Sequence, residues 1–165
     1  MATTYEPIAT TTLANSTTQT VTFSSITGTY SDIVLVINGG MATTTNYAMS
    51  IRFNSDTGSN YSLTRIYGNG SSATSDRGSN QSYIYTLAPG RDTLDATQII
   101  QVMNYSNTTT NKTCLVRSND AGYNTGAIVG LWRSTAAITS ISVSPEFTAN
   151  WKSGSTFTLY GIKAA

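Results

Sequence analysis

Apolar and polar residues alternate along most of the chain, and helical spacing is almost absent. Residues 47–53, YAMSIRF, show the pattern most clearly, because every second residue from Tyr47 to Phe53 is apolar. A period of two places the apolar side chains on one face of a strand and the polar ones on the other. The same alternation recurs in residues 20–23, 138–143 and 156–162, so these segments are predicted to be half-buried antiparallel strands.

Two further runs are apolar on both faces. They are DIVLVING at residues 32–39 and TQIIQVM at residues 97–103, and each is predicted to be a central strand. The runs between turns number about eight to ten, at the spacing expected of a sandwich or barrel. The sequence therefore predicts one all-β domain over residues 1–165, an antiparallel β-sandwich, with a jelly roll as one arrangement that fits.

Residues that favour turns separate the predicted strands. They are Gly, Asn, Asp and Pro, with Thr or Ser beside them, at positions 27–28, 38–40, 56–58, 69–70, 89–90, 124–126 and 153–154. Residues 68–82, GNGSSATSDRGSNQS, form the longest polar stretch and lack apolar periodicity. This stretch is predicted to be a surface loop.

The polar surface is mostly hydroxyl and amide. Only 10% of the residues are charged, against about 25% in ordinary globular proteins. The net charge is +1 and the basic residues are scattered, so no nucleic-acid partner is expected. Threonine-rich edges without lysine need cover, either from a closed sandwich corner or from a symmetric neighbour, and we favour an oligomer.

Targeting and redox signals are weak. Residues 1–14 lack a basic segment followed by an apolar one, so no secretory signal is predicted. No apolar run approaches the ~20 residues that span a bilayer, so no membrane partner is expected. Cys114 is the single cysteine, which excludes an intrachain disulfide, and it is predicted to be a buried apolar side chain.

Catalytic sets are hard to assemble from these residues. The chain has no histidine, which removes Ser-His-Asp sites and His-ligated metals, so we expect no enzyme, no cofactor and no metal. Asp-Thr-Gly at 56–58 followed by Gly-Arg-Asp at 90–92 resembles the order of motifs in retroviral-type aspartic proteases. Residues 54–55 and 88–89 are not the apolar pairs which that class requires, and the motifs are too close together.

Two other readings involve the carboxylates. Asn54, Asp56, Gly58 and Asn60 alternate as in a calcium loop, but only one of them is a carboxylate. Glu146 and Asp56 are candidates for a glycosidase, which needs two facing carboxylates that a sequence cannot establish. An Asx-turn at Asp56 is the simpler interpretation, and Asp56→Asn is then expected to cost little.

Aromatic residues are the candidate contact residues. Tyr83 and Tyr85 are predicted to share one face of a strand, where they could contact another subunit or a sugar. Trp151 lies at a predicted turn, where a large ring would be either a docking anchor for a partner, the favoured interpretation, or a platform for a ligand. Trp132 is predicted to be a core residue.

Five segments carry a resemblance to a known group of proteins. They are YEPIATTTL (5–13), VTFSSITGTYSDIVLV (21–36), IRFNSDTGSNYSLTRIYGNGSS (51–72), GLWRSTAAITSISVSP (130–145) and STFTLYGIK (155–163). They resemble, in the same order, small virion proteins of tailed bacteriophages, including phages of cyanobacteria. The motifs are distinctive strand and turn sequences and carry no chemical mechanism of their own.

The resemblance implies a virion structural protein without enzymatic activity. The leading expectation is a capsid decoration or cement protein on the outer shell, made in the bacterial cytoplasm. Its partners would be the major capsid protein and copies of itself, as a homotrimer. The alternative is a tail, baseplate or fibre module that recognises a host-surface glycan.

Overall fold

The computed structural model describes residues 4–163. These residues form 13 strands, which pair in antiparallel fashion into one sheet of nine strands and one of four. The prediction of an all-β antiparallel fold is therefore confirmed, whereas this strand order does not confirm a jelly roll. Within residues 4–163 no helix is long and apolar enough to cross a membrane.

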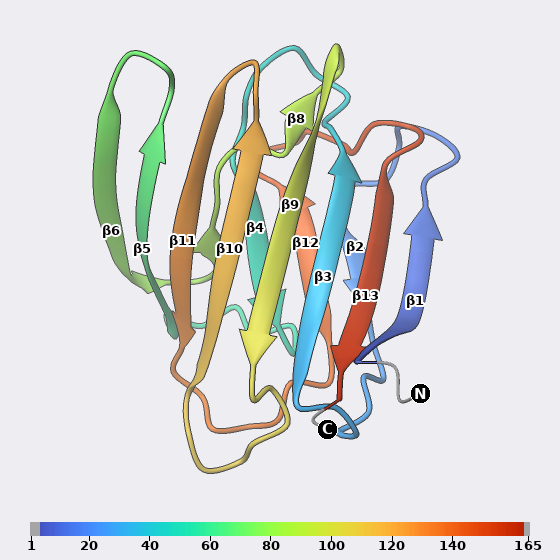
Figure 1. The fold of residues 1–165 in the computed structure, drawn as a ribbon, viewed down its shortest axis with the longest axis vertical. Coiled ribbons are helices and arrows are strands. Elements are labelled where there is room, and N and C mark those ends of the chain that lie inside the picture. The colour runs from blue at the N-terminus through green and yellow to red at the C-terminus, as the bar shows by residue number, and fades with distance from the viewer. Residues whose placement is uncertain (1–3, 164–165) are drawn as a thin grey trace.

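The two sheets form two layers, with the large sheet in front in Figure 1. In spatial order, the large sheet contains β1 (Tyr5–Thr12), β13 (Thr156–Ile162), β3 (Asp32–Gly39), β9 (Leu94–Met103), β10 (Lys112–Asp120), β11 (Asn124–Trp132), β5 (Tyr61–Gly68) and β6 (Ala73–Gln81). The short strand β8 (Gly90–Arg91) pairs with β9. The small sheet contains β2 (Val21–Phe23), β12 (Ile141–Pro145), β4 (Met49–Phe53) and β7 (Ile84–Tyr85).

The facing sides of the two sheets form the core. From the large sheet, β3 and β13 contribute inward side chains, and from the small sheet β4 and β12 do so. Each is at most 1% exposed: Ile33, Leu35, Ile37, Phe157, Leu159, Met49, Ile51, Phe53, Ile141 and Val143. The alternation read from the sequence thus identified the buried face of these strands, and β3 is central as predicted, between β13 and β9.

Three aromatic rings fill one end of the core. Trp132 stacks on Tyr61, with ring centroids 6.3 Å apart, and lies 5.8 Å from Phe53. The Tyr61 hydroxyl accepts a hydrogen bond from the Phe53 backbone N–H at 3.1 Å. Burial raises the pKa of Tyr61 to about 12, so this hydroxyl stays protonated at neutral pH. Trp132 is 3% exposed, which confirms it as a core residue.

Two local predictions are wrong. Residues 68–82 were predicted to be a surface loop, yet Ala73–Gln81 form the edge strand β6. Its side chains are polar because the strand is largely exposed, and the Arg65 guanidinium binds the Asp76 carboxylate of β6 at 2.8 Å across the pair. Residues 124–126 were predicted to be a turn but begin strand β11. The reversal occurs at residues 121–123.

The edges of the large sheet differ. At one edge, β1 carries Pro7, which has no N–H, and its register shifts between Pro7 and Ala9. At the other edge, β6 is continuous with β5 except for an irregularity near Tyr61. A bulge and a proline interrupt further pairing, so β1 is the protected edge and β6 the open one.

Candidate contact surfaces

The outer face of the large sheet has no other element of residues 4–163 lying across it, and Figure 1 looks directly onto it. Its residues alternate with the core residues and are a mixture of apolar and hydroxyl or amide side chains. The apolar ones are Val34, Val36, Tyr160, Ile99, Met103, Leu115, Ala127, Val129, Leu131 and Ile66. Polar side chains lie among them, including Thr97, Gln101, Thr113, Asn119, Thr125 and Thr158. The exposed fraction reaches 54% for Val129 and 62% for Ile66. This surface is called the outer face below.

The strand register makes the outer face continuous. Gln101 lies opposite Val34 on one side and Leu115 on the other, and Leu115 lies opposite Val129. Cross-strand neighbours on one face are about 5 Å apart, so these side chains form an unbroken row over four strands. The row contains Gln101 and the nearly buried Val34, and its more exposed apolar members are Leu115 and Val129. Exposed apolar side chains grouped on a sheet face are typical of an interaction surface.

A groove of about 330 Å³ lies on the small sheet. Tyr83, Arg52, Glu146 and Phe147 line it, together with other residues of β4 and β12 and with Gln19 and Thr20, which precede β2. The Arg52 guanidinium lies 5.0 Å from the centre of the Tyr83 ring. Burial, followed by the charge of Glu146, raises the pKa of Tyr83, so its hydroxyl remains a hydrogen-bond donor at neutral pH.

Phe147 is a contact candidate that the sequence analysis missed. Its side chain is 73% exposed, and its ring lies 5.0 Å from that of Tyr47. Its φ of 59° falls in the left-handed region, which is unfavourable for a bulky residue. Strain and exposure of a large ring together are typical of functional positions. The sequence signal that could have identified it is a phenylalanine in the turn after Pro145, where a large apolar side chain is expected to be exposed.

Tyr83 and Tyr85 do share one side of their segment, as predicted. Their ring centroids are 6.5 Å apart in an edge-to-face arrangement, while Ile84 between them is fully buried. Tyr85 is half-buried against the core, and the Arg65 guanidinium covers its ring at 4.8 Å. Tyr83, which lines the groove, is therefore the better placed of the two for contact with a partner.

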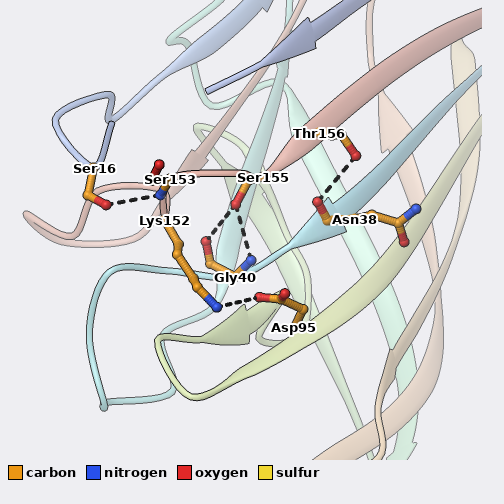
Figure 2. A network of polar contacts seen from close by, with 8 residues as sticks. All are labelled: Ser16, Asn38, Gly40, Asp95, Lys152, Ser153, Ser155 and Thr156. Carbon is orange, nitrogen blue, oxygen red and sulfur yellow. Dashed lines mark hydrogen bonds and ion pairs between the residues drawn. The ribbon is translucent and has the colours of Figure 1, made fainter. Parts of the chain in front are cut away.

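Trp151 is not a contact residue, because its side chain is 0% exposed. Its ring packs edge-on against Phe157, with centroids 4.9 Å apart. The prediction of an exposed ring assumed that this turn makes no contacts with the rest of the fold, and it is wrong. In fact polar contacts hold the turn against the rest of the fold (Figure 2). Lys152 forms an ion pair with Asp95 at 2.9 Å, and the Ser155 hydroxyl is hydrogen-bonded to the backbone of Gly40.

Asp56 forms the predicted Asx-turn and also binds side chains outside that turn. One carboxylate oxygen accepts the Gly58 backbone N–H at 2.8 Å. The other accepts the Asn60 amide at 2.9 Å and the Trp132 indole N–H at 2.7 Å. The hydrogen bond from Trp132 is the main cause that holds the pKa of Asp56 below its usual value. Asp56 is thus a structural carboxylate that ties a turn to the aromatic core.

The calcium reading of this loop does not fit its geometry. The Asn54 side-chain oxygen accepts the backbone N–H groups of Thr139 at 2.8 Å and Ser140 at 3.1 Å, so it binds a different loop from that of Asp56. Within residues 4–163 there is no group of three or more His, Cys, Asp or Glu side chains that could hold a metal. Cys114 is fully buried as predicted, and burial raises its pKa to about 12.

The comparisons with known proteins were negative. No family model matches the chain. No curated protein is significantly similar to it. The functional argument therefore rests on the geometry of the two surfaces and on the resemblance carried by the strand and turn segments.

Proposed function

We propose that this protein is a structural component of a tailed-phage virion and acts as a capsid decoration protein. The observation that carries the proposal is the outer face, a broad, nearly uncharged sheet surface that no element of residues 4–163 covers. Its partners would be the major capsid protein and further copies of the chain, in a homotrimer. No catalytic role is proposed for any residue.

The chemistry of the outer face suits a permanent contact. Apolar side chains gain free energy when water leaves them, at about 25 cal/mol per Å². Charges would have to be desolvated or paired at the same contact, and few are present: Asp32 and Asp95 near strand ends, Arg117 in β10 and Arg77 in the edge strand β6. A protein that binds only the assembled shell stabilises it by mass action.

Particles that lack the protein test the cement role. Such particles are expected to open at a lower temperature than complete particles, and adding purified protein should restore the higher temperature. The copy number per virion should be comparable to that of the major capsid protein. Unchanged opening temperature would contradict a cement role, and a copy number typical of tail components would contradict a capsid position.

Substitution on the outer face tests the contact surface. Val129→Lys places a charge where the side chain is already exposed, so the fold should survive and occupancy on capsids should fall. Thr22→Lys is the matched control, because Thr22 is exposed on the small sheet. Equal occupancy for Val129→Lys and the unchanged protein would show that the outer face is not the contact.

A further inference from the structure

The outward side of the small sheet is polar and points away from the outer face. Ile51 and Val143 point into the core, so the residues that alternate with them point to the other side. Ser50 of β4 lies there opposite Ser144 of β12, and Arg52 follows on the same side of β4. Figure 1 shows the small sheet behind the large one, so the outward sides of the two sheets face in opposite directions.

Opposite charges line the groove on this side without pairing. Arg52 and Glu146 both line it, yet within residues 4–163 no ion pair joins them. The Nε of Arg52 donates to the Ser82 carbonyl at 3.2 Å, while its two terminal NH₂ groups find no hydrogen-bond acceptor in the described part of the chain. The Tyr83 hydroxyl is hydrogen-bonded to the Glu146 carboxylate. Arg52, Tyr83 and Glu146 are each half-buried, so a ligand in the groove can reach these side chains.

Phe147 adds a flat apolar surface to the groove. Its ring is 73% exposed and is supported on one side by the ring of Tyr47, with centroids 5.0 Å apart. The Gln19 side chain donates to the Phe147 carbonyl at 2.9 Å and so helps to hold the turn in its left-handed conformation, with a φ of 59°. A bulky residue keeps such a conformation only where the surrounding structure fixes it, which is typical of ligand contacts.

The charges and the hydroxyl groups restrict the class of ligand. An anion would pair with Arg52 but would be repelled by Glu146, and a cation would meet the reverse. A neutral molecule with several hydroxyl groups suits both side chains, because each hydroxyl donates and accepts. The hydroxyl groups of Thr20 and Ser144, 2.8 Å apart, line the same groove and add partners of the same kind.

The ring and the size of the groove narrow the class further. The exposed face of Phe147 suits the apolar C–H face of a sugar ring. The volume of about 330 Å³ lies at the lower end of the range for pockets that hold drug-sized ligands, roughly 300–1,000 Å³. A disaccharide segment is a ligand of that size.

We propose that the groove on the small sheet binds a neutral oligosaccharide. Phe147 stacks against one sugar ring, the terminal NH₂ groups of Arg52 donate hydrogen bonds to its hydroxyl groups, and Glu146 accepts hydrogen bonds from them. The protein is thus a sugar-binding module in addition to a component of the shell.

The position of the groove connects it to the capsid role. In a copy seated on the shell through the outer face, the small sheet faces the medium, where sugars of the host-cell surface are within reach. This orientation rests on the proposed function, whereas sugar binding by the groove does not. The experiments below use the isolated protein, so their failure would leave the capsid role untouched, and an unchanged opening temperature of particles would leave the sugar site untouched.

The test is an NMR titration of the ¹⁵N-labelled protein. Maltose, cellobiose, lactose, mannobiose and chitobiose are each added into the millimolar range, and sodium phosphate, calcium chloride and glycylglycine are separate arms. At least one disaccharide is expected to shift the backbone amide signals of Arg52, Tyr83 and Phe147 in a saturable manner. If no disaccharide shifts these signals, or if an ion or glycylglycine alone shifts them, the proposal is overturned.

Variants at one position separate binding from folding. Phe147→Gly is expected to weaken sugar binding by about tenfold or more, because the stacking ring is lost. Its urea midpoint should be maintained, since glycine adopts a positive φ without strain. Phe147→Tyr keeps a ring and should retain binding. Tyr5→Ala is the matched control, because Tyr5 is 58% exposed on β1 of the other sheet and its loss should leave binding unchanged. Equal sugar binding by Phe147→Gly and the unchanged protein would overturn the proposal.

Discussion

Replacing Asp56 measures how strongly the turn at residues 56–58 is coupled to the aromatic core. Asp56→Ala removes three acceptor contacts and leaves the indole N–H of Trp132, a residue 3% exposed, without a partner. An unsatisfied buried donor costs about 1–3 kcal/mol, and the other two hydrogen bonds add roughly 0.5–1 kcal/mol each. The free energy of unfolding should therefore fall by about 2–5 kcal/mol.

The stability of Asp56→Asn should lie between that of Asp56→Ala and that of the unchanged protein. Its side-chain oxygen can still accept from Trp132 and Asn60, but its NH₂ group then faces the Gly58 N–H, which cannot accept a hydrogen bond. A loss of about 1–2 kcal/mol is expected, because one hydrogen bond is lost and the remaining acceptor is uncharged. This replaces the expectation, drawn from the turn alone, that Asp56→Asn costs little.

The pH dependence supplies an independent check. The folded pKa of Asp56 is below its ordinary value of 3.8, so the ionised carboxylate stabilises the fold above the unfolded pKa. That stabilisation is lost as the pH falls through the folded pKa. The difference in unfolding free energy between the unchanged protein and Asp56→Asn should thus be constant near neutral pH and shrink below pH 3.8.

Urea unfolding followed by tryptophan fluorescence measures both effects. With a slope of roughly 1–3 kcal/mol per molar urea, Asp56→Ala should lower the midpoint by about 1 M or more. Asp92→Asn is the control, since Asp92 is an exposed aspartate. A loss for Asp56→Ala within about 0.5 kcal/mol, the range of ordinary surface substitutions, would refute the reasoning.

Three further predictions concern buried positions. Trp151→Ala should lower the unfolding free energy by about 3–5 kcal/mol in urea melts, because it empties a fully buried site beside Phe157; a surface-sized loss would contradict that burial. Cys114 should react with a thiol reagent only after unfolding, and labelling of the native protein would contradict a fully buried thiol with a pKa of about 12. Gly130→Ala should lower the unfolding free energy by about 1–3 kcal/mol, because the added Cβ would lie 2.8 Å from the Cys114 sulfur. Gly68→Ala is the control. The atom nearest to its Cβ is 3.4 Å away, so this variant should lose less stability in the same melts.

Sequence patterns predicted the core strands well, because each apolar face is encoded within its own segment. Ile51 and Val143 alternate with polar residues whether or not their partners are known, so their burial follows from local order. Strand β6 lacks that signal. Its residues form a strand by pairing with the preceding strand β5 and through the contact of Asp76 with Arg65, and neither interaction leaves an apolar alternation in β6 itself.

The contact candidates were harder to predict for a related reason. Exposure of a turn residue depends on what the turn packs against, and the Lys152 and Ser155 contacts that bury Trp151 reach segments more than 50 residues away. Phe147 lies four positions earlier, and its ring is the one that is exposed, at 73%. The presence of Arg52 and Glu146 in one groove had no sequence signal, since β4 and β12 come together only in the folded sheet.

The unequal edges of the large sheet limit how copies of the chain can aggregate. The unpaired N–H and C=O groups of an open edge strand can pair with an edge strand of another copy. If each added copy offers a further open edge, fibres form. Here the chain offers β6 as a template, while Pro7 and the bulge of β1 interrupt the other end of the sheet, and β2 and β7 are only three and two residues long. Pairing through β6 would join two copies and then stop, so the sheet edges of this chain do not support open-ended polymerisation.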